Sequence, residues 1–463
     1  MSDGGFRCDF RLGCALGLVL ATTSLWARYL VFGYVDEDLE FVIWVARRCS
    51  LGDVLYVDVI DHRFPLIYQW LSLVWNLFGS YEACVLSILC IDTVSIVYAT
   101  GILCANRSSG SCALRVGAMS ALVSGCHAGH CEVMFIGALA LAGDVCARLV
   151  RGERVSWGTW VAGGAVMGAA ALVKPTICVM CAILVVIGLV CTGQWGRFAA
   201  ASAIAIAMFA LDMWLTVRTS GLDAVSRWLL SGNGGYAHDS VSLWMSGIMP
   251  TSLARALVCV SIFAVWFHTL YAHVHDRRII VCILLGIVAL CMSLLRPWPS
   301  YMLMSIAALC ATDSYEVGES LAVSALAFGL AFGCASAIAG SRTPDTARIH
   351  EIVGDSRSVA PAYFSGSVAL MRELGLESPY DLPFLCSVGI DEWDRTWVED
   401  VRHGRWQYLV ISEKERDVFE SILGHYDVVD VTDGRVVLES SGGCPCDLIE
   451  CEPYEEPKAL LPL

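Results

Sequence analysis

Long apolar segments recur along the first 340 residues and limit what this chain can fold into. A membrane-spanning helix needs roughly 20 mostly apolar residues, within a range of about 17–25. The composition agrees, because 57% of the residues are hydrophobic and only 16% are charged. Soluble proteins carry about 25% charged residues. The sequence therefore predicts an all-α polytopic membrane protein. We expect about 11 spans, near residues 11–32, 81–104, 113–127, 132–148, 156–173, 176–192, 197–217, 251–273, 279–295, 300–313 and 319–340.

The net charge of −15 lies almost wholly in the C-terminal part of the chain. Residues 341–463 hold 24 acidic and 11 basic residues, which is −13 of the total. The membrane part is therefore close to neutral, and no basic run predicts nucleic-acid binding. We expect two domains, a transmembrane domain over 1–340 and an acidic, water-soluble α/β domain over 341–463.

The tail has its own secondary-structure signals. A buried-strand pattern covers 406–412, an amphipathic helix is predicted over 413–423, and a hairpin turns at Asp433-Gly434. Residues 344–375 are predicted to be helical, and the acidic end, 444–463, to be disordered. The pattern around Cys444, Cys446 and Cys451 leaves a disulfide open and does not favour a metal site, because no histidine lies nearby at zinc-finger spacing. Most of the 22 cysteines lie within apolar runs, where cysteine behaves as a small hydrophobic residue.

The basic residues of the short loops predict the orientation in the membrane. Cytoplasmic loops are enriched in Lys and Arg. With a cytoplasmic N-terminus, the inner loops hold most of the short-loop arginines, among them Arg107, Arg115, Arg148, Arg151, Arg154, Arg197, Arg277 and Arg278. An odd number of spans then places the C-terminal domain outside the cytoplasm. We therefore expect a multi-pass protein of the cell membrane with an inside N-terminus and an outside tail.

This topology gathers ionisable residues on the outer face. Lys174 is the only lysine of residues 1–340 and is followed by Pro175 inside a long apolar stretch. It is either a snorkelling lysine in an ordinary turn or a site residue, since intramembrane ionisable groups are costly and usually functional. The large first outer loop, 33–80, adds two acidic clusters. The outer-face residues are Asp36, Glu37, Asp38, Asp58, Asp61, His62, Arg63, His130, Glu132, Lys174, Asn233, Tyr236, His238, Asp239 and Arg296.

Several of these residues lie in segments that resemble a known family. The first loop has an acidic pair, Asp36-Glu37, near its start and the run Arg63-Phe64-Pro65-Leu66-Ile67-Tyr68 near its end. "GHCEVMF" with Glu132, "AALVKPT" with Lys174, and "RPWPSYML" with Arg296 and Tyr301 follow in order. Together they resemble the GT-C membrane glycosyltransferases, in the branch of the bacterial protein O-mannosyltransferases and the aminoarabinose transferase of lipid A. The departures are Arg63 where the family has Lys, Phe64 where it has Pro, and Ser300 where His is expected.

The resemblance implies transfer of a sugar from a polyprenyl-phosphate carrier, usually with inversion, to a protein, glycan or lipid acceptor on the outer face. Asp36 is the expected base that takes the acceptor proton, with Glu37 second. Lys174, Arg296 and Arg63 are the expected cations for the leaving phosphate. Asp58, Asp61, His62, Glu132 and Tyr301 are expected to shape the loop or contact substrate. No cofactor is predicted; clustered carboxylates are compatible with a divalent metal, but no ligand spacing identifies one.

The same residues can also have purely structural roles. The acids at 36–38 can complement the dipole of the helix that follows them. Asp58, Asp61 and Arg63 can form a surface ion network without any catalytic role. At the level of function, the alternatives are a secondary transporter, another lipid-linked polysaccharide polymerase or ligase, and a scaffold that displays the tail. The absence of internal repeats argues against the transporter.

Overall fold

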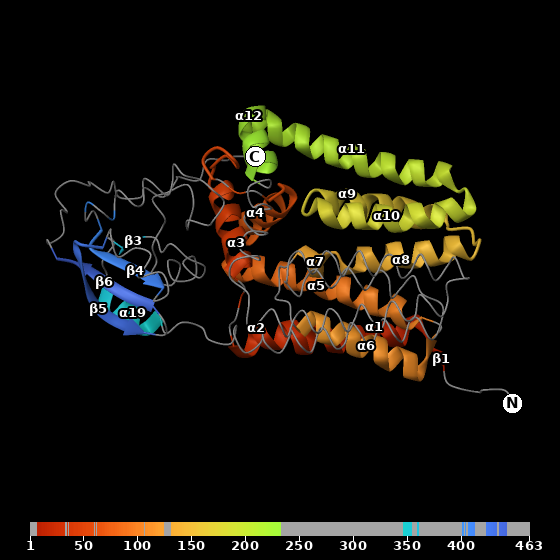
Figure 1. The fold of residues 1–463 in the computed structure, drawn as a ribbon, viewed down its shortest axis with the longest axis horizontal. Coiled ribbons are helices and arrows are strands. Elements are labelled where there is room, and N and C mark those ends of the chain that lie inside the picture. The colour runs from red at the N-terminus through yellow and green to blue at the C-terminus, as the bar shows by residue number, and fades with distance from the viewer. Residues whose placement is uncertain are drawn as a thin grey trace. The chain divides into compact units, whose positions relative to one another are not determined.

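The computed structural model describes two separate parts of the chain in detail. The described residues are 7–32, 35, 37–59, 61, 63–105, 107–124, 131–232, 346–353, 359–360, 401, 403, 406–412, 423–432 and 435–441. The chain divides into two compact units. Unit 1 comprises Met1–Leu39, Arg63–Leu222 and Ser240–Ser341, and unit 2 comprises Glu40–His62, Asp223–Asp239 and Arg342–Leu463. Figure 1 shows unit 1 as a set of long helices and unit 2 with a small sheet.

Helices dominate unit 1 (Figure 1). The first is continuous from Phe10 to Val31, although it contains one π-helical stretch, η1. Asp9 begins it by accepting a hydrogen bond from the backbone N–H of Leu12 at 2.7 Å. The elements are α1 (Phe10–Ala21), η1 (Thr22–Trp26), α2 (Ala27–Phe32), α4 (Leu66–Phe78), α5 (Tyr81–Cys104), α6 (Ser109–Ser124), α7 (Cys131–Met134), α8 (Ile136–Val150), α9 (Trp157–Ala171), α10 (Pro175–Thr192) and α11 (Trp195–Ser220).

Glycines let the first and second long helices of unit 1 approach closely. Gly13 and Gly17 lie one turn apart on α1, and a Cβ on either would come within 2.8 Å of the α5 backbone, at Thr100 and Val97. Small residues at this spacing are a common basis for helix packing in membranes. Side-chain hydrogen bonds add to the packing, since Trp26 Nε1 donates to Thr93 Oγ1 at 2.8 Å. The N-terminal helix is therefore fixed along α5.

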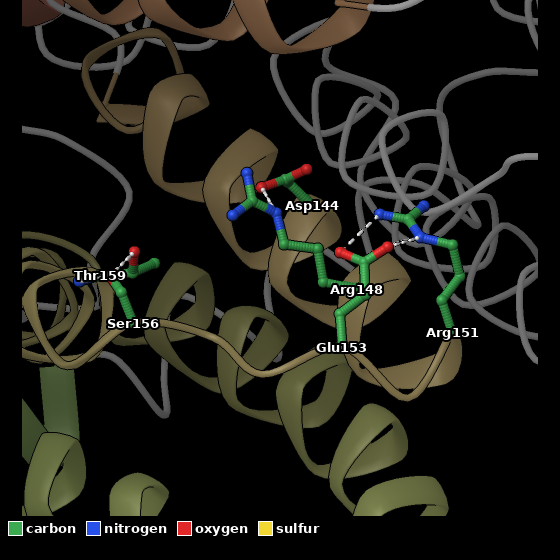
Figure 2. A network of polar contacts seen from close by, with 6 residues as sticks. All are labelled: Asp144, Arg148, Arg151, Glu153, Ser156 and Thr159. Carbon is green, nitrogen blue, oxygen red and sulfur yellow. Dashed lines mark hydrogen bonds and ion pairs between the residues drawn. The ribbon is translucent and has the colours of Figure 1, made fainter.

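The α8–α9 turn of unit 1 contains several polar contacts (Figure 2). Arg148 pairs with Asp144 one turn earlier on α8 at 2.9 Å, and Arg151 pairs with Glu153 at 2.5 Å. Ser156 then begins α9 by accepting from the backbone N–H of Thr159. The side chain of Gln194, between α10 and α11, donates to the carbonyl of Glu153 at 2.8 Å. These contacts hold the α8–α9 and α10–α11 turns at one end of the bundle (Figure 1).

Seven of the predicted spans coincide with helices of unit 1 to within a few residues. Among the described residues, three helices are long and apolar enough to cross a membrane: Phe10–Val31, Tyr81–Cys104 and Trp195–Ser220. Two shorter apolar helices, Leu66–Phe78 and Pro175–Val190, accompany them. The four spans predicted after residue 250 lie outside the described residues. The polytopic class follows from this architecture, while the count of 11 stays a prediction.

Unit 2 contains a four-stranded sheet with the order β3-β4-β6-β5. The predicted strand and hairpin of the tail are confirmed, because β4 (Tyr408–Ser412) pairs antiparallel with β6 (Arg435–Ser440), which pairs antiparallel with β5 (Tyr426–Thr432). β3 (Val359–Ala360) adds a parallel edge, and α19 (Thr346–Val353) packs Ile349 and Val353 against Val410 and Val437. Unit 2 also includes most of α3 (Glu37–Ser50), α12 (Leu222–Ser226) and η2 (Arg227–Gly232).

The helix predicted over 344–375 is wrong in part. The described helix there covers Thr346–Val353, and Val359–Ala360 is a strand. Ala360 precedes Pro361, and the proline ring disfavours helical backbone at the residue before it. Proline thus directs this segment into the sheet. The helix predicted at 413–423, the turn at Asp433-Gly434 and the cysteines of the acidic end lie outside the described residues.

Candidate functional site

Lys174 lies in the tight turn between α9 and α10. It is the residue just before α10, with extended backbone at φ −149° and ψ 93°, because Pro175 follows as the first helical residue. Its N–H donates to the carbonyl of Ala170 at 2.7 Å, and its carbonyl accepts from Ile177 at 3.0 Å. The side chain is half-buried. Lys174 therefore adds a positive charge at the N-terminus of an 18-residue helix, where unpaired N–H groups already favour anions.

The end of the first loop is anchored beside this turn. The backbone N–H of Leu66 donates to the carbonyl of Leu172 at 3.3 Å, two residues before Lys174. Phe64 packs against Phe209 of α11, with ring centroids 6.1 Å apart. The run "RFPLIY" thus meets the Lys-Pro turn, as the grouping of these two motifs on one face predicts. Three elements distant in sequence, α4, the α9–α10 turn and α11, meet here.

Arg63 is close to this junction and carries an ion pair. Its guanidinium lies 2.8 Å from Asp38, whose side chain is 62% exposed. The Arg63 side chain itself is 20% exposed. Because the Asp38 carboxylate is open to solvent, an anionic ligand can compete with it for the guanidinium. The structure therefore joins the acidic start of the first loop to its basic end, within unit 1.

Asp212 of α11 is an acidic residue that sequence analysis did not select. Gln69 of α4 shares a side-chain hydrogen bond with it. Its Oδ2 is buried and has no hydrogen-bond partner among the described residues. Asp92, in the middle of α5, is a second acid within a span, and its side chain is fully buried. An acid within an otherwise apolar span was a signal available in the sequence for both residues.

An apolar groove of about 510 Å³ begins at α4. Trp70, four residues beyond Leu66, lines it together with residues of α5, α8 and α9, among them Val94, Tyr98, Ala138 and Val166. At ~1.5 Å per residue, Trp70 lies about 6 Å along α4 from the hydrogen bond to the Lys174 turn. The Trp70 indole N–H donates to Ser87 Oγ at 3.3 Å. Leu73 and Leu77 of α4 are exposed apolar side chains as well.

The first-loop residues that belong to unit 2 form a turn of their own. The backbone N–H of Val54 donates to the Asp58 carboxylate at 2.8 Å, and the N–H of Asp58 donates to the carbonyl of Val54, also at 2.8 Å. Tyr56 at the centre has a left-handed φ of 68° and is buried. Asp61 is also buried, with 4% exposure. For Asp58 these contacts show a structural task, whereas its predicted contact with substrate stays a prediction.

The remaining predicted site residues are only partly placed. Glu37 begins α3 and Glu132 belongs to α7, but the structure does not describe their side chains. Asp36, His62, Arg296 and Tyr301 lie outside the described residues. Within the described part of the chain, no three Asp, Glu, His or Cys side chains are arranged to hold a metal ion. The described residues thus bring together Lys174, Arg63 and the start of α4, and leave the assignment of the base as a prediction.

Comparison with known proteins identifies the fold. No protein-family model matches the sequence, and no curated protein matches it. Among solved structures, ArnT from Cupriavidus metallidurans bound to undecaprenyl phosphate superposes with a TM-score of 0.54 at 16% identity. The superposition covers 92% of this chain and 97% of that one. The apo state of the same ArnT gives a TM-score of 0.53 at 15% identity, with the same coverage.

The chain has the fold of ArnT. The resemblance predicted from the order of the loop motifs, to a GT-C glycosyltransferase fold, is thereby confirmed. The matched part of the chain is longer than the predicted transmembrane domain, because 92% of 463 residues exceeds the 340 residues predicted for that domain. At 16% identity the likeness to ArnT is one of fold.

Proposed function

We propose that this protein is a membrane glycosyltransferase that moves a sugar from a polyprenyl-phosphate carrier to an acceptor outside the cytoplasm. The observation that carries the proposal is the ArnT fold over nearly the whole chain, found with ArnT bound to undecaprenyl phosphate. The placement of Lys174 at a helix N-terminus beside the end of the first loop supports it, since such a corner suits a phosphate.

The proposed reaction is a displacement at the anomeric carbon. The acceptor oxygen attacks that carbon while the carboxylate of Asp36 takes its proton, with Glu37 as the second candidate. The bond between the sugar and the phosphate oxygen breaks, and the polyprenyl phosphate leaves with the electron pair. Attack opposite the leaving group inverts the configuration of a hexosyl or related sugar. The leaving group needs no general acid because phosphate is already a stable anion.

Cations are assigned to the leaving phosphate. Lys174, Arg296 and Arg63 supply positive charge where negative charge grows in the transition state. For Arg63 the exposed ion pair with Asp38 gives the guanidinium a default partner that phosphate replaces. The apolar groove beside α4 supports a substrate with a hydrocarbon chain. The acceptor is a protein, glycan or lipid. The alternative, a polysaccharide polymerase or ligase, differs in using another lipid-linked donor.

The test measures transfer of label from a polyprenyl-phosphate hexose to envelope acceptors by membranes that contain the protein. We expect Asp36→Asn to lower the rate by about 10²–10⁴-fold, the usual contribution of a general base. Lys174→Met should lower it by about 10²–10³-fold, because a charge aimed at the leaving group is lost. Lys174→Arg should recover only part of that loss, since the guanidinium differs in shape and hydration from the ammonium.

A matched control removes a cation far from the proposed site. Arg151→Met breaks the pair with Glu153 in the α8–α9 turn (Figure 2) and should leave transfer within about twofold of the wild-type rate. Equal losses in Lys174→Met and Arg151→Met would show a general effect of charge removal and would contradict the assignment of Lys174. Transfer that persists in Asp36→Asn would remove Asp36 as the base.

A further inference from the structure

Three cysteine side chains meet at the inner end of unit 1. Cys8 ends the short strand β1 (Arg7–Cys8), Cys104 is the last residue of α5, and Cys112 lies in the first turn of α6. Their exposed fractions are 4%, 0% and 2%, and all three are free thiols. They form one small cluster, with Leu16 and Val116 packed against it. Residues far apart in sequence thus place three thiols side by side.

Two of the thiols are close to bonding distance. The Sγ atoms of Cys104 and Cys112 lie 2.7 Å apart, and a disulfide bond is about 2.05 Å long. Closing the bond therefore requires a shift of only about 0.7 Å. The connection between them is itself held in place, because β2 (Arg107–Ser108) pairs antiparallel with β1. No rearrangement of helices is needed to bring the two sulfurs together.

Cys8 is the third member of the cluster. Burial raises the pKa of the Cys8 thiol to about 11 and that of the Cys112 thiol to about 11 as well, so the pKa does not distinguish the two. The distance between the sulfurs does, because Cys104 Sγ and Cys112 Sγ lie 2.7 Å apart. The geometry therefore selects Cys104 and Cys112 as the pair that can join.

We propose that Cys104 and Cys112 are a redox-sensitive pair that closes to an intramolecular disulfide. The two thiols give up two protons and two electrons, and one sulfur–sulfur bond forms. The two electrons and two protons pass to a small uncharged oxidant that can enter a buried site. A membrane quinone is one example, and it becomes the quinol. With the N-terminus in the cytoplasm, as the basic residues of the short loops predict, this end of the bundle lies where thiols are kept reduced. The disulfide is therefore the oxidised state of a switchable site.

Tryptic peptides report the bond directly. The purified full chain is treated with diamide, an azo compound that accepts the two hydrogens, its remaining thiols are alkylated, and it is digested. Cleavage after Arg107 and Arg115 releases residues 108–115, which contain Cys112 as the sole cysteine. Cys104 leaves in the peptide 64–107 and Cys8 in the peptide 8–11. We expect residues 108–115 joined to residues 64–107, and separated again by a reductant.

Variants decide which sulfurs are joined. Cys8→Ser should keep the linked peptide, whereas Cys104→Ser and Cys112→Ser should abolish the link between 64–107 and 108–115. Cys84→Ser is the matched control, because Cys84 is a buried cysteine of the same peptide that is not part of the cluster, and the link should persist. Failure of diamide to produce the link in the wild-type chain would overturn the proposal. So would a link from 108–115 to 8–11 in its place.

Discussion

At the scale of single residues, the first loop mixes structural and chemical tasks that its sequence does not separate. Asp58 was selected as a possible substrate contact, yet its carboxylate accepts from Val54 at 2.8 Å and closes a turn. We expect Asp58→Ala to lower the free energy of unfolding by about 1 kcal/mol, as for lost side-chain caps. Asp58→Asn keeps an acceptor oxygen and should change it little. Thermal melts of the purified variants measure both. A loss of transfer in Asp58→Asn with unchanged stability would instead indicate a role at the substrate.

Some of the ionisable site residues were predictable from the sequence, and others are identified only by the structure. Lys174 was predictable because it is the only lysine of the membrane part and is followed by proline. The partner of Arg63 was not, since Asp36, Glu37 and Asp38 are adjacent acids and only the folded loop selects Asp38. Asp212 was not predicted because it lies within a span and not in a loop, and its hydrogen bond with Gln69 is visible only in the structure.

At the scale of elements, α9 and α11 pack through glycine. A Cβ on Gly164 would lie 2.5 Å from the carbonyl oxygen of Ala201, and one on Gly168 would lie 3.1 Å from Met208. Because the obstacle at Gly164 is backbone, the helices must separate. We expect Gly164→Ala to destabilise the protein by about 1–3 kcal/mol, the usual cost of overpacking. Melting temperature in detergent is the measurement.

The neighbouring glycine supplies the control for this packing. A Cβ on Gly163 meets no atom within 4 Å, so Gly163→Ala should leave the melting temperature unchanged or raise it slightly through helix propensity. If the two variants melt alike, close packing at Gly164 does not limit stability.

Helix positions were predictable because apolar length dictates them, and Pro175 and Gly193 mark the ends of α10 as the sequence suggests. The packing partners of the helices were not predictable. A pair of glycines four residues apart predicts close packing but does not identify the helix that packs against it. The strand at Val359–Ala360 was missed for a related reason. Its pairing partner β4 lies about 50 residues away, at Tyr408–Leu409, and two residues carry too little pattern to predict a strand.

At the scale of the whole molecule, the distribution of basic residues between the two ends of unit 1 predicts its orientation in the membrane. The α8–α9 and α10–α11 turns, which carry Arg148, Arg151, Arg154 and Arg197, are joined at one end of unit 1. Lys174 lies in the turn at the opposite end of α9 and α10. Arginine-rich short turns favour the cytoplasmic side. The fold match alone does not fix the direction of insertion, so orientation rests on this asymmetry and can be tested.

Fusions of a reporter test the orientation in a bacterial host. Alkaline phosphatase folds only outside the cytoplasm because it requires disulfides. We expect a fusion after Leu463 to be active and a fusion after Glu153, in the arginine-rich turn, to be inactive. A fluorescent reporter that matures only in the cytoplasm should give the opposite pattern at both positions. The reverse result would place Lys174 and the first loop on the cytoplasmic face. That would contradict an extracytoplasmic site, because the base and the phosphate-binding cations would then face the wrong compartment.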